Sequence, residues 1–184
     1  MDDSLTGRLL IASPTLLDPN FARTVVFMCA HGDEGAFGLV INRPLEADVL
    51  DHLPEWQRLA SSPAVIFSGG PVEPDSAVAL GCVRGETAAE GWSGVTDELG
   101  VFDLRAGPDL LGDSLERVRV FSGHAGWGAG QLEAEIEEEG WFVVDAEPGD
   151  PFSREPERLW REVLRRQPGR LAIFADFPVD PSVN

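Results

Sequence analysis

The densest run of glycine is Gly-His-Ala-Gly-Trp-Gly-Ala-Gly at positions 123 to 130, between an expected strand and an expected helix. Backbone N–H groups in such a loop, ahead of a helix N-terminus, can cradle an anion. The run lacks the Gly-Lys-Ser/Thr ending of a P-loop and the G-x-G-x-x-G dinucleotide pattern. Glu133 and Glu135 would also repel a phosphate. The sequence therefore favours tight backbone packing around Trp127, with anion binding as the alternative.

Cys29 and His31 form a second candidate site. They lie two positions apart in an apolar segment, so on a strand their side chains share one face. A thiol activated by a neighbouring imidazole would support redox or nucleophilic chemistry. Reactive thiols need electropositive, partly exposed surroundings, which an acidic chain offers in few places. The sequence favours Cys29 as a buried small hydrophobe and His31 at a solvated strand end, with thiol chemistry as the alternative.

Arg43 is the third candidate, in the segment Ile41-Asn42-Arg43-Pro44 where an expected strand ends. Its planar guanidinium suits a carboxylate or phosphate of a ligand or a partner. A salt bridge that fixes the turn before Pro44 is the commoner use of such a residue. The sequence favours that structural role and keeps ligand binding as the alternative.

No other pattern identifies a metal, a cofactor or a reaction. The three histidines are scattered, the two cysteines form no C-x-x-C pair, and no EF-hand spacing or G-x-S-x-G elbow occurs. Paired carboxylates carry no information in a chain with 32 acidic residues. The sequence therefore predicts no catalytic residue, no cofactor and no metal, and it favours a protein that is not an enzyme.

Charge narrows the classes of partner. The chain has 184 residues, with 14 basic residues against 32 acidic ones and a formal net charge of -18. Such a charge disfavours nucleic acid and anionic membranes as partners. The apolar runs are short, and Met1-Asp2-Asp3-Ser4 is acidic where a secretory signal is basic. Two cysteines exclude a disulfide framework, so a cytoplasmic location is expected.

Most of the elements that position these residues are predicted as strands, because the apolar segments are short, β-branched and bounded by glycine, proline, aspartate or asparagine. The predicted strands are Arg8 to Ala12, Thr24 to His31, Phe37 to Asn42, Ala64 to Phe67, Ser76 to Cys82, Leu99 to Asp103, Arg117 to Phe121, Trp141 to Asp145 and Arg170 to Phe174.

Helices are fewer. The sequence predicts them at Leu45 to Leu53, Pro108 to Leu115, Gln131 to Glu139 and Pro156 to Arg166. Strands outnumber helices without strict alternation, which favours the α+β class. We expect residues 1–184 to form a single compact domain with a mixed, mainly antiparallel β-sheet and a few flanking helices.

Two patterns predict how the strands pair. The segments Thr24 to Ala30 and Phe37 to Asn42 flank a glycine-bounded turn and predict a hairpin, central because both of its faces are apolar. The segments 66–70 and 120–124 both carry Phe-Ser-Gly at the end of an apolar strand. If these strands lie side by side, their following loops open at one edge of the sheet and form the rim of a pocket.

The charges are also unevenly distributed. Residues 133–157 hold 10 acidic residues against Arg154 alone, and residues 158–170 hold five arginines against Glu162. The acidic stretch thus directly precedes a basic helix face. This adjacency predicts either intramolecular pairing or a polar docking surface for a partner.

Several segments together resemble the bacterial YqgE/AlgH family, and the resemblance covers roughly Gly7 to Phe174. The matching segments are 9–14 (LLIASP), 18–21 (DPNF), 25–31 (VVFMCAH), 35–44 (GAFGLVINRP), 69–72 (GGPV) and 123–136 (GHAGWGAGQLEAEI). His124 and Ala129 depart from the family pattern, where tyrosine and proline are frequent.

The resemblance implies a cytoplasmic α+β domain from a family without an established active site, one branch of which carries the label of transcriptional regulator. The matching positions include Cys29 and His31, which remain redox candidates. The other matching positions, taken as candidate ligand-binding residues, are Asn42, Arg43, Gly69, Gly70, Pro71, Gly126, Trp127, Gly128, Gly130 and Gln131. Glycine and proline dominate this set, which is more typical of backbone architecture than of catalysis.

Three hypotheses follow. The first is a non-enzymatic domain that binds an unknown protein or small-molecule partner, with a regulatory role. The second is a regulator that binds DNA directly, which the net charge disfavours. The third is an enzyme that uses Cys29 with His31, or an anion site in the loop Gly123 to Gly130. The sequence does not specify an oligomeric state.

Overall fold

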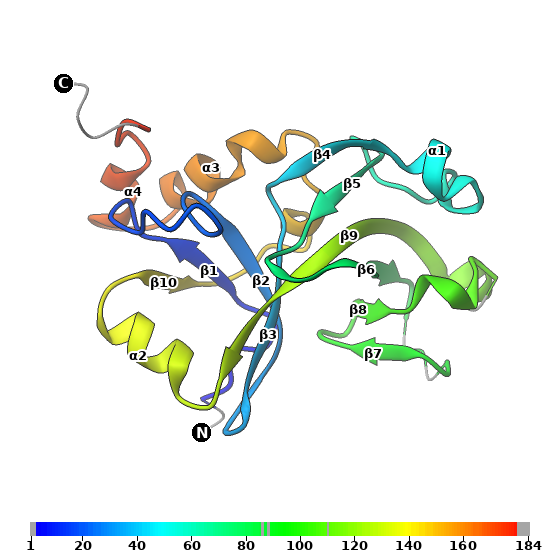
Figure 1. Cartoon of the computed structure of the whole chain (residues 1–184), viewed down its shortest axis with the longest axis horizontal. Coiled ribbons are helices and arrows are strands. Elements are labelled where there is room, and N and C mark those ends of the chain that lie inside the picture. The colour runs from blue at the N-terminus through cyan, green and yellow to red at the C-terminus, as the bar shows by residue number, and fades with distance from the viewer. Residues whose placement is uncertain (1–2, 86, 88, 110, 180–184) are drawn as a thin grey trace.

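The hairpin predicted from the sequence forms the centre of the fold. In the computed structural model, which describes residues 3–85, 87, 89–109 and 111–179, β2 (Val25–Gly32) pairs antiparallel with β3 (Gly35–Val40). β1 (Leu9–Ala12) and β10 (Trp141–Val144) extend the sheet on the β2 side. The long strand β9 (Leu115–Gly128) follows on the β3 side. The hairpin prediction is therefore confirmed (Figure 1).

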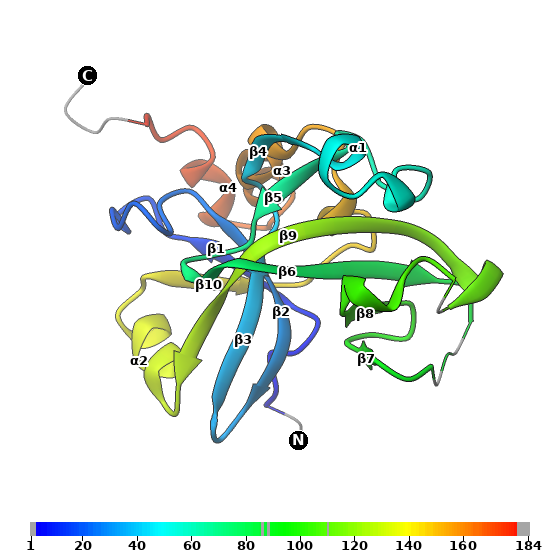
Figure 2. The same cartoon turned by 45° about the vertical axis from the view of Figure 1, so that its right-hand side comes forward.

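β9 joins this half of the sheet to a second half. Its neighbour there is β6 (Val72–Val83), followed by β8 (Leu99–Phe102) and β7 (Trp92–Gly94). The order of hydrogen-bonded neighbours among the described residues is β10-β1-β2-β3-β9-β6-β8-β7, and β4 (Pro44–Asp48) and β5 (Val65–Ser68) branch off at β9. Figure 2 shows β9 running across both halves. The sheet is mixed and mainly antiparallel.

The repeated Phe-Ser-Gly pattern marks a true strand pair. β5 lies parallel to β9, with Phe67 opposite Phe121 and Ser68 opposite Ser122. The glycines that follow do not form two open loops, because a Cβ atom at Gly70 would lie 2.2 Å from the backbone of His124. The two chains therefore cross in close contact at this edge of the sheet.

Helices cover both faces of the β1-β2-β3 half, which explains why its strands are apolar on both faces. Leu9 and Phe27 belong to the core cluster beneath α3 (Leu159–Arg165). Their chain neighbours Leu10 and Val26 belong to the opposite cluster beneath α2 (Gln131–Glu137). Because side chains alternate along a strand, each strand supplies both cores.

A third core cluster is built around Trp56 under the β6-β8-β7 half of the sheet, and the short helix α1 (Val49–His52) contributes Val49 to it. The last described helix is α4 (Leu171–Phe174). Among the described residues, α1 lies between β4 and β5 and α2 between β9 and β10, without a regular alternation of strand and helix, so the predicted α+β class is confirmed. No helix among the described residues is both long and apolar enough to cross a membrane.

Three predicted elements were wrong in type. Residues 170–174 were expected as a strand, but α4 places Leu171 and Phe174 three residues apart on one face, where Phe174 stacks on Phe142. Residues 45–53, expected as a helix, divide between β4 and α1 because the first half pairs with β5. Residues 108–115, expected as a helix, hold a 3-10 turn at Gly112–Ser114 and the start of β9; position 110 lies outside the described residues.

The glycine-rich segment was also expected as a loop, and most of it is strand. β9 continues to Gly128, and Gly126 and Gly128 pair with Phe37 and Gly35 of β3. Close backbone approach explains the glycines, because a Cβ atom at Gly35 would lie 2.3 Å from the Trp127 carbonyl oxygen. The short β7 strand was not predicted.

Candidate functional site

The residues that connect β1 to β2, here called the β1–β2 loop (residues 13–24), lie at the centre of the candidate site. Asn42, two residues after the end of β3, holds this loop with both ends of its side-chain amide. Its Oδ1 accepts a hydrogen bond from the Val25 N–H at 2.9 Å, and its Nδ2 donates to the Arg23 carbonyl at 2.9 Å. Asn42 is buried. The amide therefore sets where the loop enters β2.

Arg43 holds the same loop from its outer side. Its guanidinium donates to the carbonyl oxygens of Asn20, at 2.8 Å, and Ala22, at 2.9 Å. Burial lowers the pKa of Arg43, and the charge of Asp18 partly offsets that effect. The sequence favoured a salt bridge that fixes the turn before Pro44, but Arg43 binds backbone carbonyls of the β1–β2 loop and forms no ion pair within the described part of the chain.

A second set of hydrogen bonds lies where β9 meets α2. The Trp127 and Trp141 indole N–H groups each donate to Glu135 Oε2 at 2.9 Å. Gln131 Nε2 donates to Glu135 Oε1 at 3.1 Å, and Gln131 Oε1 accepts from the Gly128 N–H at 3.1 Å. Both indoles are buried. The Glu135 carboxylate is therefore fixed in one orientation.

Phe21 of the β1–β2 loop completes this arrangement. Its ring stacks on Trp127 with centroids 6.1 Å apart and meets the edge of Trp141 at 5.5 Å. Between the loop and α2 lies a cavity of about 370 Å³, which we call the α2 cavity. It is lined by Thr15, Leu16, Asp18, Phe21, Gln131, Glu135, Glu138, Gly140 and Trp141.

The α2 cavity is strongly acidic. Three carboxylates line it, from Asp18, Glu135 and Glu138, and its lining contains no arginine. A partly exposed phenylalanine ring and the edge of Leu16 supply an apolar wall. Such a surface attracts a positively charged group that has an apolar stem.

The Gly69-Gly70-Pro71 segment lies at a different place. The Gly69 carbonyl accepts from the Val40 N–H at 2.8 Å, and its own N–H donates to the Ser122 carbonyl at 2.9 Å. Gly70 and Pro71 line a smaller cavity of about 200 Å³ together with Arg43. The predicted ligand-binding residues therefore form two groups, one around the Gly69-Gly70-Pro71 segment and Arg43, and one where β9 meets α2. Both groups border the β1–β2 loop.

Cys29 and His31 do not form a reactive pair in this geometry. Cys29 belongs to the core beneath α3, and burial raises the pKa of its thiol well above its ordinary value. His31 Nδ1 accepts from the Leu5 N–H at 3.1 Å, and its Nε2 lies 2.7 Å from Glu133 Oε1. The geometry favours the packing interpretation of Cys29. Within the described part of the chain, no group of three or more acidic, histidine or cysteine side chains could hold a metal.

The comparisons with known proteins agree with the sequence motifs. A family profile described as AlgH-like matches residues 9–172. The chain belongs to the AlgH-like family. UPF0301 proteins of Streptomyces coelicolor and Thermobifida fusca are 53% and 46% identical to it, over 98% of this chain and 96% of each relative.

Two solved structures are also similar to this AlgH-like chain. A crystal structure of a Corynebacterium diphtheriae protein has a TM-score of 0.85 at 30% identity and covers 93% of this chain and 91% of its own. The solution structure of AlgH from Pseudomonas aeruginosa has a TM-score of 0.71 at 31% identity, over 96% and 95% of the two chains.

Sequence reasoning missed several residues of the site in this AlgH-like chain. Glu135 was interpreted only as a charge near a helix start, and Phe21 and Trp141 were not singled out as site residues. The one available signal was the spacing of Gln131 and Glu135, because residues four apart on a helix are neighbours. The contacts to Phe21 and Trp141 join distant segments, which local spacing does not reveal.

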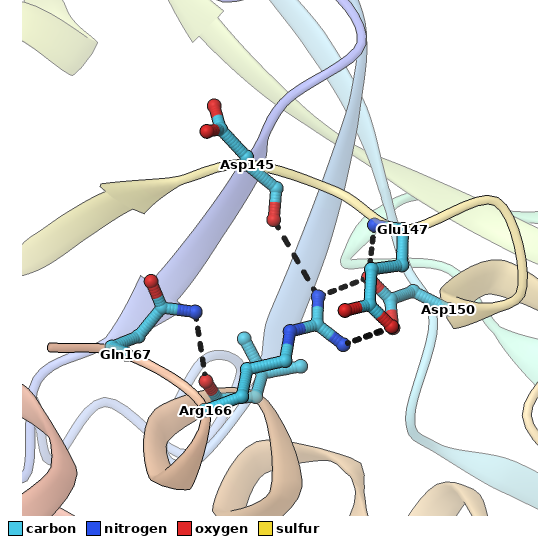
Figure 3. Close-up of polar contacts among 6 residues, drawn as sticks. Asp145, Glu147, Asp150, Arg166 and Gln167 are labelled. Atoms are coloured by element: carbon cyan, nitrogen blue, oxygen red, sulfur yellow. Dashed lines mark hydrogen bonds and ion pairs between the residues drawn. The ribbon is translucent and has the colours of Figure 1, made fainter.

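The acidic stretch and the basic helix are largely paired with each other. Arg166 binds Asp150 through both terminal nitrogens, at 2.7 and 2.5 Å, and Asp150 also accepts from the Glu147 N–H at 2.7 Å (Figure 3). The hydrogen bond to Asp150 is the main cause that raises the pKa of Arg166. Arg170 pairs with Glu139 at 3.6 Å. Of the two predicted uses of this adjacency, intramolecular pairing accounts for these arginines.

Proposed function

We propose that this AlgH-like protein is a non-enzymatic binding domain that takes a cationic group in the α2 cavity. The group would come from a small amine or guanidine, or from a basic side chain of a protein partner. The observation that carries the proposal is the Glu135 carboxylate, fixed by two indoles on the wall of an acidic, partly apolar cavity.

The fixed carboxylate is suited to binding because its orientation is set before a ligand arrives. A carboxylate offers about four acceptor positions, and Trp127, Trp141 and Gln131 use three of those on Glu135. One position on Oε1 therefore remains for a donor. A preorganised acceptor reduces the entropic cost of binding.

The other lining residues select the same chemistry. Asp18 and Glu138 add negative charge, and the face of Phe21 can contact a cation. A regulatory role would follow from a partner protein whose basic side chain docks here. Direct DNA binding receives no support from this site, because a net charge of -18 and an acidic lining both repel phosphates. The proposal includes the cytoplasmic location expected from the sequence.

Calorimetric titration of the whole chain with agmatine, a guanidinium compound with an apolar stem, tests the proposal. We expect saturable binding that weakens by about fivefold in Glu138→Gln, because one of three lining charges is lost. Glu137→Gln is the matched control, since this exposed residue of α2 does not line the cavity. It should change the dissociation constant by less than about twofold.

Two outcomes contradict the proposal. One is the absence of saturable heat up to about 10 mM agmatine at low salt, which corresponds to binding weaker than about 3 kcal/mol. The other is an equal loss in Glu137→Gln and Glu138→Gln, which would mean that agmatine responds to the overall charge and not to this cavity.

A further inference from the structure

A second cavity, of about 390 Å³, lies beside α3, on the opposite face of the β1-β2-β3 half from the α2 cavity. We call it the α3 cavity. Its lining differs from that of the α2 cavity, because it contains four arginines and two glutamates. The lining residues are Arg23, Glu157, Arg158, Trp160, Arg161, Glu162, Arg165 and Val179.

Two of these arginines have carboxylate partners. Arg158 pairs with Glu155 and Arg165 with Asp176, each at 3.1 Å. Arg161 forms no ion pair or hydrogen bond within the described ranges.

Arg23 is the other arginine of the cavity lining that forms no ion pair with a described carboxylate. Its guanidinium lies 4.5 Å from the centre of the Trp160 ring, and it donates to the Phe177 carbonyl. Burial, and then the positive charge of Arg161, lower the pKa of Arg23. Both arginines line the same cavity, and an anion bound there would offset the repulsion between their positive charges.

The backbone at Arg23 is held in an unusual conformation. Its φ angle is 58°, in the left-handed region that few residues other than glycine adopt. The buried Asn42 amide fixes this conformation through the Arg23 carbonyl, at 2.9 Å. Backbone strain of this kind persists where the surrounding structure holds it, and here it directs an arginine to the α3 cavity.

We infer that the α3 cavity binds a small organic dianion, of the phosphate monoester class. Arg161 of α3 and Arg23 of the β1–β2 loop are the two lining arginines without a carboxylate partner among the described residues, and their guanidinium donors suit the several acceptor oxygens of a phosphoryl group. A cavity of about 390 Å³ also has room for the organic part of such a molecule.

Calorimetric titration of the whole chain with glycerol 3-phosphate tests this inference, with glycerol and acetate as the uncharged and singly charged comparisons. We expect saturable binding of glycerol 3-phosphate, about tenfold weaker binding of acetate, and no binding of glycerol. Arg161→Gln should weaken glycerol 3-phosphate binding by about tenfold, because one charge-assisted contact is lost.

Arg154→Gln is the matched control, since this exposed arginine removes the same charge but does not line the cavity. It should change affinity by less than about twofold. An unchanged thermal midpoint for Arg161→Gln would show that the variant folds. The inference is overturned if glycerol 3-phosphate gives no saturable binding up to about 10 mM, or if Arg154→Gln loses as much affinity as Arg161→Gln. Glu138→Gln should leave this binding intact, so the result is independent of the α2 proposal.

Discussion

The α2 and α3 cavities are of similar size and lie on opposite faces of the same strands, yet carboxylates line the first and four arginines with two glutamates line the second. The β1–β2 loop serves both. It contributes Asp18 and Phe21 to the α2 cavity, and two residues further on it contributes Arg23 to the α3 cavity. The net charge of -18 agrees with the acidic lining of the α2 cavity but gives no sign of the arginines that line the α3 cavity. The local arrangement of side chains decides which ligand each face attracts.

The two cavities also differ in how their charges are held. Glu135 in the α2 cavity is fixed by neutral donors, the indoles and an amide. Arg23 and Arg161 both line the α3 cavity, and neither forms an ion pair with a carboxylate among the described residues. The first is a preorganised acceptor, and the second is a pair of donors whose repulsion a ligand would relieve.

The largest expected effect comes from the support that both cavities share. Asn42→Ala leaves the buried Val25 N–H and the Arg23 carbonyl without their partners. We expect the free energy of unfolding to fall by about 2 to 4 kcal/mol, measured by urea denaturation, and binding at both cavities to weaken. Asn20→Ala is the control, because Arg43 binds only the backbone of Asn20. Full ligand affinity at both cavities in Asn42→Ala would show that the loop needs no such support.

The second-largest expected effect should weaken ligand binding at the α3 cavity and leave binding at the α2 cavity unchanged. Asp150→Asn weakens the buried contact to Arg166 at the end of α3 (Figure 3). We expect a loss of about 2 kcal/mol in unfolding free energy, with weaker glycerol 3-phosphate binding and unchanged agmatine binding. Glu116→Gln breaks an exposed pair with Arg84 and should cost less than about 1 kcal/mol. Equal losses in the two variants would contradict the role given to the buried pair.

The third expected effect should weaken ligand binding at the α2 cavity only. Glu135→Ala removes the acceptor of two buried indole N–H groups. We expect the unfolding free energy to fall by about 1 to 3 kcal/mol, agmatine binding to be lost, and glycerol 3-phosphate binding to stay within about twofold. Glu137→Ala provides the control on the same helix. Loss of both ligands in Glu135→Ala would mean that the cavities are not separate.

The smallest effect concerns acid pH and the start of α2. A backbone hydrogen bond and the contact with His31 lower the pKa of Glu133 below its ordinary value of 4.5. The folded state therefore gains stability from Glu133 above that pH and loses it as the pH falls through the lowered pKa. The Glu133→Gln variant should have a lower free energy of unfolding than the wild-type protein near neutral pH. This difference should shrink as the pH falls, which denaturation at several pH values would measure. A difference independent of pH would contradict this assignment.

Much of the fold was predictable because its signals are local. The hairpin of β2 and β3 follows from apolar segments around a glycine-bounded turn, and the α2 and α3 helices follow from their periodicity and end signals. The errors in element type arise where tertiary packing overrides the local sequence pattern. Residues 171–174 are apolar enough for a strand, but they form a helix because their packing against Phe142 decides the outcome.

The candidate sites were less predictable, because their contacts join segments far apart in sequence. Asn42 and Arg43 were named as candidate ligand-binding residues, yet their partners in the β1–β2 loop lie about twenty positions away. Glu135 gains its role from Trp127 and Trp141, and Arg23 gains its role from α3. Only the tertiary arrangement reveals such pairs.

The most direct test of two separate cavities for ligands of opposite charge uses the indole N–H signals of the protein in a nuclear magnetic resonance titration. Trp127 and Trp141 report on the α2 cavity, Trp160 lines the α3 cavity, and the distant Trp56 is an internal reference. Agmatine should shift the Trp127 and Trp141 signals, and glycerol 3-phosphate should shift the Trp160 signal. Shifts of all three signals by either compound, or of none by both, would contradict the account.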